Sequence, residues 1–151
     1  MRHAVTTLAA FAVGCSLAAS ASAGSSNLCS LNVKSQLKPL GVSTMCKPSK
    51  TAHIASLTIA GADWGATDNY VGVQVYTGAS EARFKQQFGN LGKPVELGSF
   101  AREDVGSSSV TVSAWVKGKG LVVLLNKGPI AKTKPYAAPV LAFAKVVAKQ
   151  L

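Results

Sequence analysis

The stretch SSSVTVSAWVKGKGLVVLLN, residues 107–126, decides the fold. In its first half, valine and alanine alternate with serine, threonine and tryptophan, which is the two-residue period of a β-strand with unlike faces. Gly118 and Gly120 follow and suit a tight turn, because glycine readily adopts a positive φ. The run 121–125 is apolar throughout, which is typical of a strand covered on both sides. The stretch therefore predicts a β-hairpin that other segments must cover.

Residues on either side of this hairpin supply the rest of the expected fold. Alternating patterns predict strands at 53–60, 70–77 and 95–101, and apolar stripes predict helices at 30–40, 80–88 and 139–151. The turn-rich run GADWGATDN, residues 61–69, predicts a loop, and Arg102-Glu103-Asp104 predicts a charged turn. The sequence thus predicts one α+β domain in the order α-β-β-α-β-β-β-α. Its antiparallel sheet has about five strands, with the helices packed on one face.

The two faces of this sheet are expected to differ. If the hairpin turn closes at Gly118-Lys119, its valines share one face, which the helices carrying Phe84, Phe88 and Phe143 would cover. We expect the other face to be the binding surface, because aromatic rings offer apolar area with a polar edge. Its residues, joined by two turn lysines, are Tyr70, Gln74, Tyr76, Thr111, Trp115, Lys117 and Lys119. In the alternative, the helix that follows Cys29 covers this face and Trp115 belongs to the core.

The first residues, MRHAVTTLAAFAVGCSLAASASAG, have the form of an export signal. A basic end precedes a short apolar run, and Ala21-Ser22-Ala23 matches the small-residue site of signal peptidase. We therefore expect residues 1–23 to be a signal peptide and residues 24–151 to form a single exported domain. In an alternative interpretation, Ala12-Val13-Gly14-Cys15 is a lipoprotein box and Cys15 carries a lipid. Both place the domain outside the cytoplasm: in the periplasm, in the cell envelope or secreted.

Charge and cysteine content narrow the class of protein. The full chain has a formal net charge of +10, and excision of residues 1–23 removes one positive charge, Arg2, to leave +9. This excess favours an anionic envelope component, a lipid or an acidic protein as partner, whereas the scarcity of arginine argues against specific nucleic-acid recognition. Cys29 and Cys46 are an even pair in an exported chain, which predicts one disulfide.

Motifs for catalysis or metal binding are poorly represented. His53 stands alone at a strand start, and Ser35-Gln36-Leu37-Lys38 matches S-x-x-K without the companion motifs of that enzyme class. Asp63 and Asp68 share a turn-rich stretch but lack the spacing of a calcium loop. The sequence therefore predicts a protein that is not an enzyme and that has no cofactor and no metal site.

The arrangement of these features resembles small secreted or lipid-anchored actinobacterial envelope domains of unknown function. The shared places are Cys29, Cys46, the strand Gly98-Ser99-Phe100-Ala101, the hairpin at 110–125 and the final helix at 140–151. Such domains often carry a tryptophan soon after the second cysteine, where this chain has Lys47-Pro48. The resemblance implies location and fold and brings no activity with it.

The expected function is therefore a non-catalytic exported binding domain. Its ligand would be anionic or apolar, or a partner protein, and would be met by the aromatic sheet face and the lysine-rich loops. A second hypothesis is an inhibitor of a secreted enzyme, in which a loop at 61–69 or 117–120 enters a cleft. A third is a small hydrolase that uses His53.

Overall fold

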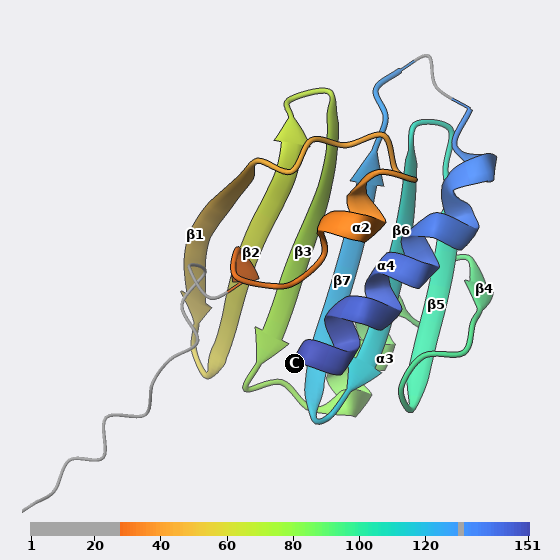
Figure 1. The fold of residues 1–151 in the computed structure, drawn as a ribbon. Coiled ribbons are helices and arrows are strands. Elements are labelled where there is room, and N and C mark those ends of the chain that lie inside the picture. The colour runs from red at the N-terminus through yellow and green to blue at the C-terminus, as the bar shows by residue number, and fades with distance from the viewer. Residues whose placement is uncertain (1–27, 130–131) are drawn as a thin grey trace, which may run out of the picture.

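The computed structural model of the chain describes residues 28–129 and 132–151 (Figure 1). The expected signal peptide and Cys15 lie outside these residues. A single sheet of seven antiparallel strands, in the order β1-β2-β3-β7-β6-β5-β4, carries helices on both faces. Its strands are β1 (Cys46–Ile54), β2 (Leu57–Ala66), β3 (Asn69–Thr77), β4 (Lys93–Pro94), β5 (Phe100–Val105), β6 (Ser109–Val116) and β7 (Lys119–Asn126). The helices are α2 (Lys34–Leu37), α3 (Glu81–Phe88) and α4 (Ala137–Gln150), with a 3₁₀ turn, η1 (Lys134–Tyr136), leading into α4.

The β6–β7 hairpin forms the centre of the sheet, as the sequence predicts. Its turn closes one residue earlier than expected, at Lys117-Gly118, so that Val116 pairs with Lys119 and Ala114 with Leu121. Both turn residues have positive φ, 50° and 76°. A two-residue hairpin loop with this geometry matches the right-handed twist of the two strands that it joins. The pairing differs from the expected one by two residues. A two-residue shift leaves every side chain on its predicted face.

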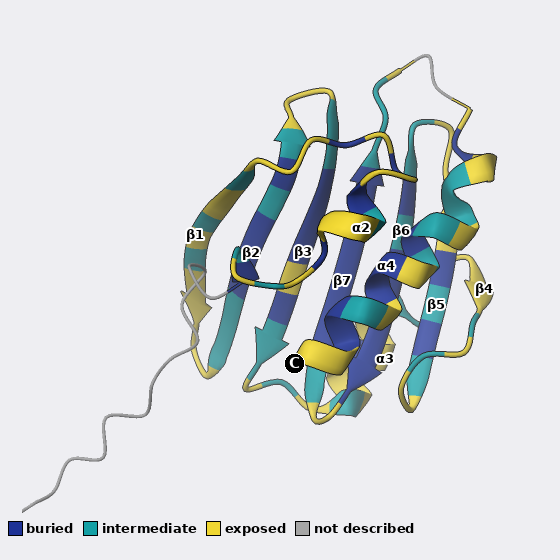
Figure 2. Cartoon of the chain, in the orientation of Figure 1, coloured by how far each residue is buried: buried dark blue, intermediate teal, exposed yellow. Residues whose placement is uncertain are grey.

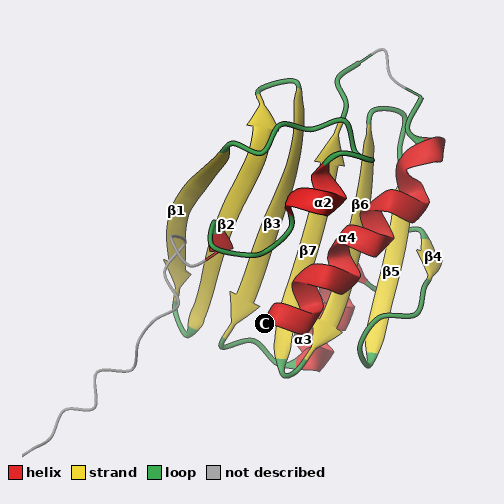
Figure 3. Ribbon diagram, viewed as in Figure 1, coloured by secondary structure: helices red, strands yellow, loops and turns green. Residues whose placement is uncertain are grey.

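Helices α2 and α4 cover the valine face of the sheet (Figures 1 and 3). The face of α4 predicted from its spacing is buried there, with Phe143 meeting Trp64 of β2 edge-to-face at 5.9 Å between ring centroids. Helix α2 is a single turn, but Leu37 and Leu40 beside it are fully buried. Figure 2 shows the resulting buried band through the central strands. The main core of the protein therefore lies between the valine face of the sheet and helices α2 and α4.

Helix α3 lies on the opposite face, so the prediction that all helices pack on one side is wrong (Figure 1). Its boundaries are as predicted: Ser80 accepts a hydrogen bond from the backbone N–H of Arg83, and Gly89 ends the helix. Phe84 is buried against Trp115 and Val122, which point away from the valine face. Trp115 and Val122 form an apolar patch on this face, and α3 packs on that patch instead of on the valine face.

The sheet has seven strands rather than about five, because the predicted strands at 53–60 and 95–101 are each replaced by two strands. The predicted strand at 53–60 is two strands, because Ala55, with a φ of 54°, forms a tight turn without a glycine to signal it. The predicted loop at 61–69 is mostly strand β2, in which Trp64 is buried. The expected charged turn Arg102-Glu103-Asp104 belongs to β5, and residues 95–99 separate it from the short β4.

The predicted disulfide joins Cys29 to Cys46, with Cα atoms 5.6 Å apart. It ties the segment that leads into α2 to the first residue of β1. Within the described part of the chain, no helix has the length and apolar character needed to cross a membrane. A disulfide of this kind fits an oxidising compartment outside the cytoplasm.

Candidate functional site

The five non-lysine residues of the predicted binding surface do share one sheet face, but α3 covers part of it. Trp115 is 8% exposed and lies 5.7 Å from Phe84, measured between ring centroids. Tyr76 is half-buried against the rings of Phe84 and Phe88, and this burial raises the pKa of its hydroxyl. Trp115 is therefore a core residue, as in the alternative interpretation, although the helix above it is α3 and not the one after Cys29.

Lys117 and Lys119 do not reach this face. Their ammonium groups donate hydrogen bonds to the backbone carbonyls of Lys149 and Leu151, each at 3.1 Å, at the end of α4. Cations are favourable at a helix C-terminus, where the last carbonyls lack partners within the helix. The ammonium group of Lys127 also donates hydrogen bonds, to the backbone carbonyl of Leu40 and to Oδ1 of Asn69. These lysines hold the fold together at that side of the sheet.

The uncovered part of the same face contains a small hollow, which we call the open-face hollow. It has a volume of about 300 Å³ and is lined by Ser49, Asp63, Tyr70, Gly72, Gln74, Thr111, Val122 and Leu124. Three of the predicted site residues, Tyr70, Gln74 and Thr111, therefore meet here. Tyr76 stands beside them and donates a hydrogen bond from its hydroxyl to Oε1 of Gln74, 2.9 Å long.

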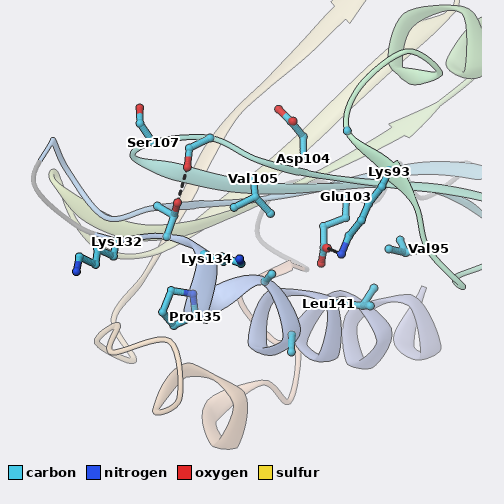
Figure 4. Close-up of a pocket in the computed structure, with 15 residues that line it drawn as sticks. Lys93, Val95, Glu103, Asp104, Val105, Ser107, Lys132, Lys134, Pro135 and Leu141 are labelled. Atoms are coloured by element: carbon cyan, nitrogen blue, oxygen red, sulfur yellow. Dashed lines mark hydrogen bonds and ion pairs between the residues drawn. The ribbon is translucent and has the colours of Figure 1, made fainter.

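A larger hollow lies on the other face, between β4–β5 and the start of α4, and we call it the α4 groove (Figure 4). Its volume is about 1450 Å³. The strand side is formed by Val95, Glu103 and Val105, and the helix side by Pro135, Ala137, Ala138 and Leu141. Val105 is 38% exposed, although it is a large apolar residue. The groove therefore offers a trough of mostly apolar side chains to solvent.

Charge in the α4 groove is unevenly distributed. Glu103 is buried and forms an ion pair with Lys93, 3.1 Å between Nζ and Oε2, so these two charges offset each other. Figure 4 shows Asp104 and Ser107 directed away from α4. Lys132 and Lys134 line the end near η1, and within the described residues neither has an acidic partner within 4.0 Å. That end of the groove is positively charged.

A buried hydrogen bond fixes this charged end to the sheet. Thr133 lies between the two lysines, is buried, and donates from its hydroxyl to the carbonyl oxygen of Gly106. The backbone N–H of Tyr136 in turn bonds the carbonyl of Thr133 at 2.8 Å. The loop that carries Lys132 and Lys134 is thereby attached both to the β5–β6 connection and to η1.

The residues of the α4 groove were not predicted as a site. Lys132 and Lys134 belong to a basic segment of the sequence, but nothing in the sequence places that segment beside β5. The alternation of Ala101, Glu103 and Val105 was the available signal, and the charges of Arg102-Glu103-Asp104 concealed it. Recognising a buried glutamate requires knowing its partner, Lys93, which is ten residues away in the sequence.

His53 lies on the exposed edge strand β1, where its Nδ1 is 3.1 Å from the Thr58 hydroxyl. In the described residues, no three His, Cys, Asp or Glu side chains gather closely enough to hold a metal ion. The Asp63 carboxylate accepts a hydrogen bond from Ser49, and Asp68 lies apart from it in the β2–β3 turn. Comparisons with protein-family models, curated proteins and solved structures found no match for this chain.

Proposed function

We propose that this protein is a non-catalytic exported binding domain that holds an amphipathic anion in the α4 groove. Such a ligand has an apolar chain and one anionic head, as in a fatty acid or an acidic lipid. The observation that carries the proposal is an exposed apolar trough that ends at two lysines without an acidic partner among the described residues. Two segments that are distant in sequence, residues 92–107 and 132–141, build it.

The apolar part of the groove suits a hydrocarbon chain. Val95 and Val105 line the groove opposite α4, and Leu141 lines it from α4 (Figure 4). Ala137 and Ala138 add small apolar side chains to the helix side. Each methylene buried on such a surface contributes about 0.8 kcal/mol. A chain of moderate length therefore gains useful affinity without any specific polar contact.

The charged end supplies the head-group preference. Lys132 and Lys134 approach a ligand from one loop, and the ion pair with Lys93 neutralises Glu103 in the middle of the groove. The net charge of +9 that remains after excision of residues 1–23 (+10 for the full chain less Arg2) adds a long-range attraction for anions. A head group that presents one or two negative charges is therefore favoured over a neutral one.

Export is part of the proposal. The disulfide is compatible with an oxidising location, and residues 1–23 have the pattern of a signal peptide. We expect the exported protein to begin at Gly24. Intact mass measurement tests this, because a lipid on Cys15 would give a heavier chain that begins earlier.

Calorimetric titration with twelve-carbon amphiphiles tests the ligand. Dodecyl phosphate and dodecanoate should bind, whereas the neutral dodecyl maltoside and the cationic dodecyltrimethylammonium should bind much more weakly. The affinity for the anions should fall with added salt, since screening shortens the Debye length from roughly 10 Å at 0.1 M to 3 Å at 1 M. Equal affinity for all four amphiphiles would remove the proposal. Anionic vesicles in a parallel titration distinguish a membrane surface from a free amphiphile as the source.

Charge-reversal variants supply the control. Lys132→Glu/Lys134→Glu should weaken dodecyl phosphate binding by roughly tenfold or more, because two attractive contacts become repulsive. Lys34→Glu/Lys38→Glu makes the same change in net charge at two exposed positions, the first residue of α2 and the residue after its end, and should leave most of the affinity intact. If both pairs weaken binding equally, the groove has no special role.

The inhibitor hypothesis stays a prediction with less support than the binding proposal. It needed a protruding loop at 61–69 or 117–120. Residues 61–66 are strand, and the connection after Val116 is a two-residue turn. No other observation favours it.

A further inference from the structure

The open-face hollow is a second candidate site with a different chemistry from the α4 groove. It lies on the opposite face of the sheet, and its walls are Ser49, Asp63, Tyr70, Gln74, Thr111 and Leu124. These residues come from five adjacent strands, β1, β2, β3, β7 and β6. At 4.7–4.9 Å per strand, the axes of these five strands span about 19 Å. The hollow is a channel of about 300 Å³ on this part of the sheet.

Glycine forms the floor of this channel at Gly72. A Cβ atom there would lie 2.6 Å from Oδ1 of Asp63 and 3.7 Å from Cε2 of Tyr70. The backbone of Gly72 does not have a positive φ, so the strand itself would accept another residue. The Asp63 carboxylate therefore lies over Gly72, and a side chain at this position would displace it. Glycine inside a strand often marks a close approach of another group, and here it allows the carboxylate to lie in the channel.

The polar side chains around Gly72 differ in type, and several of them have hydrogen-bonding capacity that is not used within the protein. The carboxylate of Asp63 accepts one hydrogen bond, from Ser49 at 3.0 Å, and has further capacity to accept. The Tyr76 hydroxyl bonds Oε1 of Gln74, which leaves the amide N–H groups as donors. Tyr70 and Thr111 contribute hydroxyls that can donate or accept. Donors and acceptors therefore alternate along the channel.

The charge of the channel excludes the ligands proposed for the α4 groove. Asp63 is the one charged residue among those that line it, and within the described residues it has no cation within 4.0 Å. An anion brought here would be repelled by this carboxylate. A neutral ligand that carries many hydroxyl groups would be hydrogen-bonded, and its C–H surface could pack on Tyr70 and Leu124.

We infer that the open-face hollow binds a neutral glycan. A sugar ring offers what the channel requires: hydroxyls at the edge for Asp63, Gln74 and Thr111, and an apolar face for the ring of Tyr70. An oligosaccharide could place a ring in the hollow while its other units extend over the neighbouring strands. The inference stands independently of the α4 groove, because no residue lines both hollows.

NMR titration of the ¹⁵N-labelled exported protein tests the inference. The probes are cellohexaose, maltohexaose, mannohexaose and chitohexaose at millimolar concentration, with a heparin hexasaccharide as the anionic control and choline as a cationic one. At least one neutral hexasaccharide should shift the amides of Asp63, Gly72 and Gln74. If none does, or if only heparin or choline shifts them, the inference is overturned.

Variants separate a site from a chance contact. Gly72→Val should abolish the shifts by filling the floor, and Tyr70→Ala should weaken binding at least tenfold. Gly106→Ala is the matched control, since a Cβ there meets nothing closer than 3.4 Å and lies outside the hollow. Gln74→Ala, at an exposed position, covers the case in which Gly72→Val does not fold. Binding that survives both Tyr70→Ala and Gln74→Ala would contradict the assignment. Lys132→Glu/Lys134→Glu should bind the glycan like the unmodified protein, so each proposal can fail separately.

Discussion

Lys93 and Glu103 form an ion pair whose two partners have opposite surroundings. The side chain of Lys93 is 69% exposed and that of Glu103 is 3% exposed, and the two residues are also neighbours across β4 and β5. The carboxylate therefore depends on a lysine that is itself well solvated. Loss of the lysine leaves a buried charge without a partner, whereas loss of the glutamate leaves a lysine in water.

This asymmetry predicts the outcome of a double-mutant cycle. Lys93→Met should lower the free energy of unfolding by about 1–2 kcal/mol, less than for a fully buried pair because the lysine is exposed. Lys93→Met/Glu103→Met should recover most of that loss, since apolar residues can replace a buried ion pair at little cost. Urea denaturation measures both. A double variant no more stable than Lys93→Met would show that the carboxylate does not depend on Lys93.

The disulfide should contribute to stability mainly through the segment that it closes. Cys29 and Cys46 are 17 residues apart, and replacing both by serine should cost about 2–4 kcal/mol. Hydrogen exchange should rise first at residues 31–42, because α2 is one turn long and relies on this closure. Reduction of the unmodified protein is the control and should give the same pattern. A rise in hydrogen exchange in β6 and β7 as large as that at residues 31–42 would contradict this view.

The β1–β2 turn offers a stabilising substitution. Ala55 has a φ of 54°, a conformation that glycine adopts without strain. Ala55→Gly should therefore raise the free energy of unfolding, by about 0.5–1 kcal/mol. Ala52→Gly, three residues earlier within the exposed strand β1, is the matched control and should lower it. Thermal unfolding of the two variants decides the question, and a loss of stability in both would show that the turn is not strained.

The fall in the free energy of unfolding at acid pH should depend in part on Glu81. A hydrogen bond from Lys85, and a second from Ser99, hold the pKa of this exposed carboxyl below 4.5. A lowered pKa in the folded state contributes stability above the pKa of the unfolded chain, and that contribution is lost as the pH falls through the folded value. The unmodified protein should be more stable than Glu81→Gln at neutral pH, and the two should converge in acid. A constant difference down to low pH would assign the effect to packing instead.

Side-chain spacing was sufficient to predict the elements with strong patterns. The β6–β7 hairpin, the buried face of α4 and the Ser80 cap of α3 are all read from residues close in sequence. Turns without glycine were missed, as at Ala55, and so was a strand whose residues resemble a loop. In β2 the alternation of Ala60, Ala62 and Trp64 was present, but glycine, aspartate and asparagine around it suggested turns.

Local sequence patterns could not predict which face of the sheet each helix covers or which distant residues each side chain contacts. An amphipathic helix such as α3 shows that one of its faces is apolar and does not show which face of the sheet will receive it. Phe84 could have met the valines or Trp115, because the central hairpin carries apolar side chains on both faces. The placement of Lys117 and Lys119 at the end of α4 likewise depends on a contact across 32 residues of sequence.

The central claim is that an amphipathic anion occupies the α4 groove. The most direct test is the site at which dodecyl phosphate binds, determined by NMR on the exported protein. We predict shifts at the amides of Val105, Gly106, Lys134 and Leu141, which surround the groove, and none in the centres of β2 and β3. Shifts confined to those two strands, or no saturable shifts at all, would contradict the account.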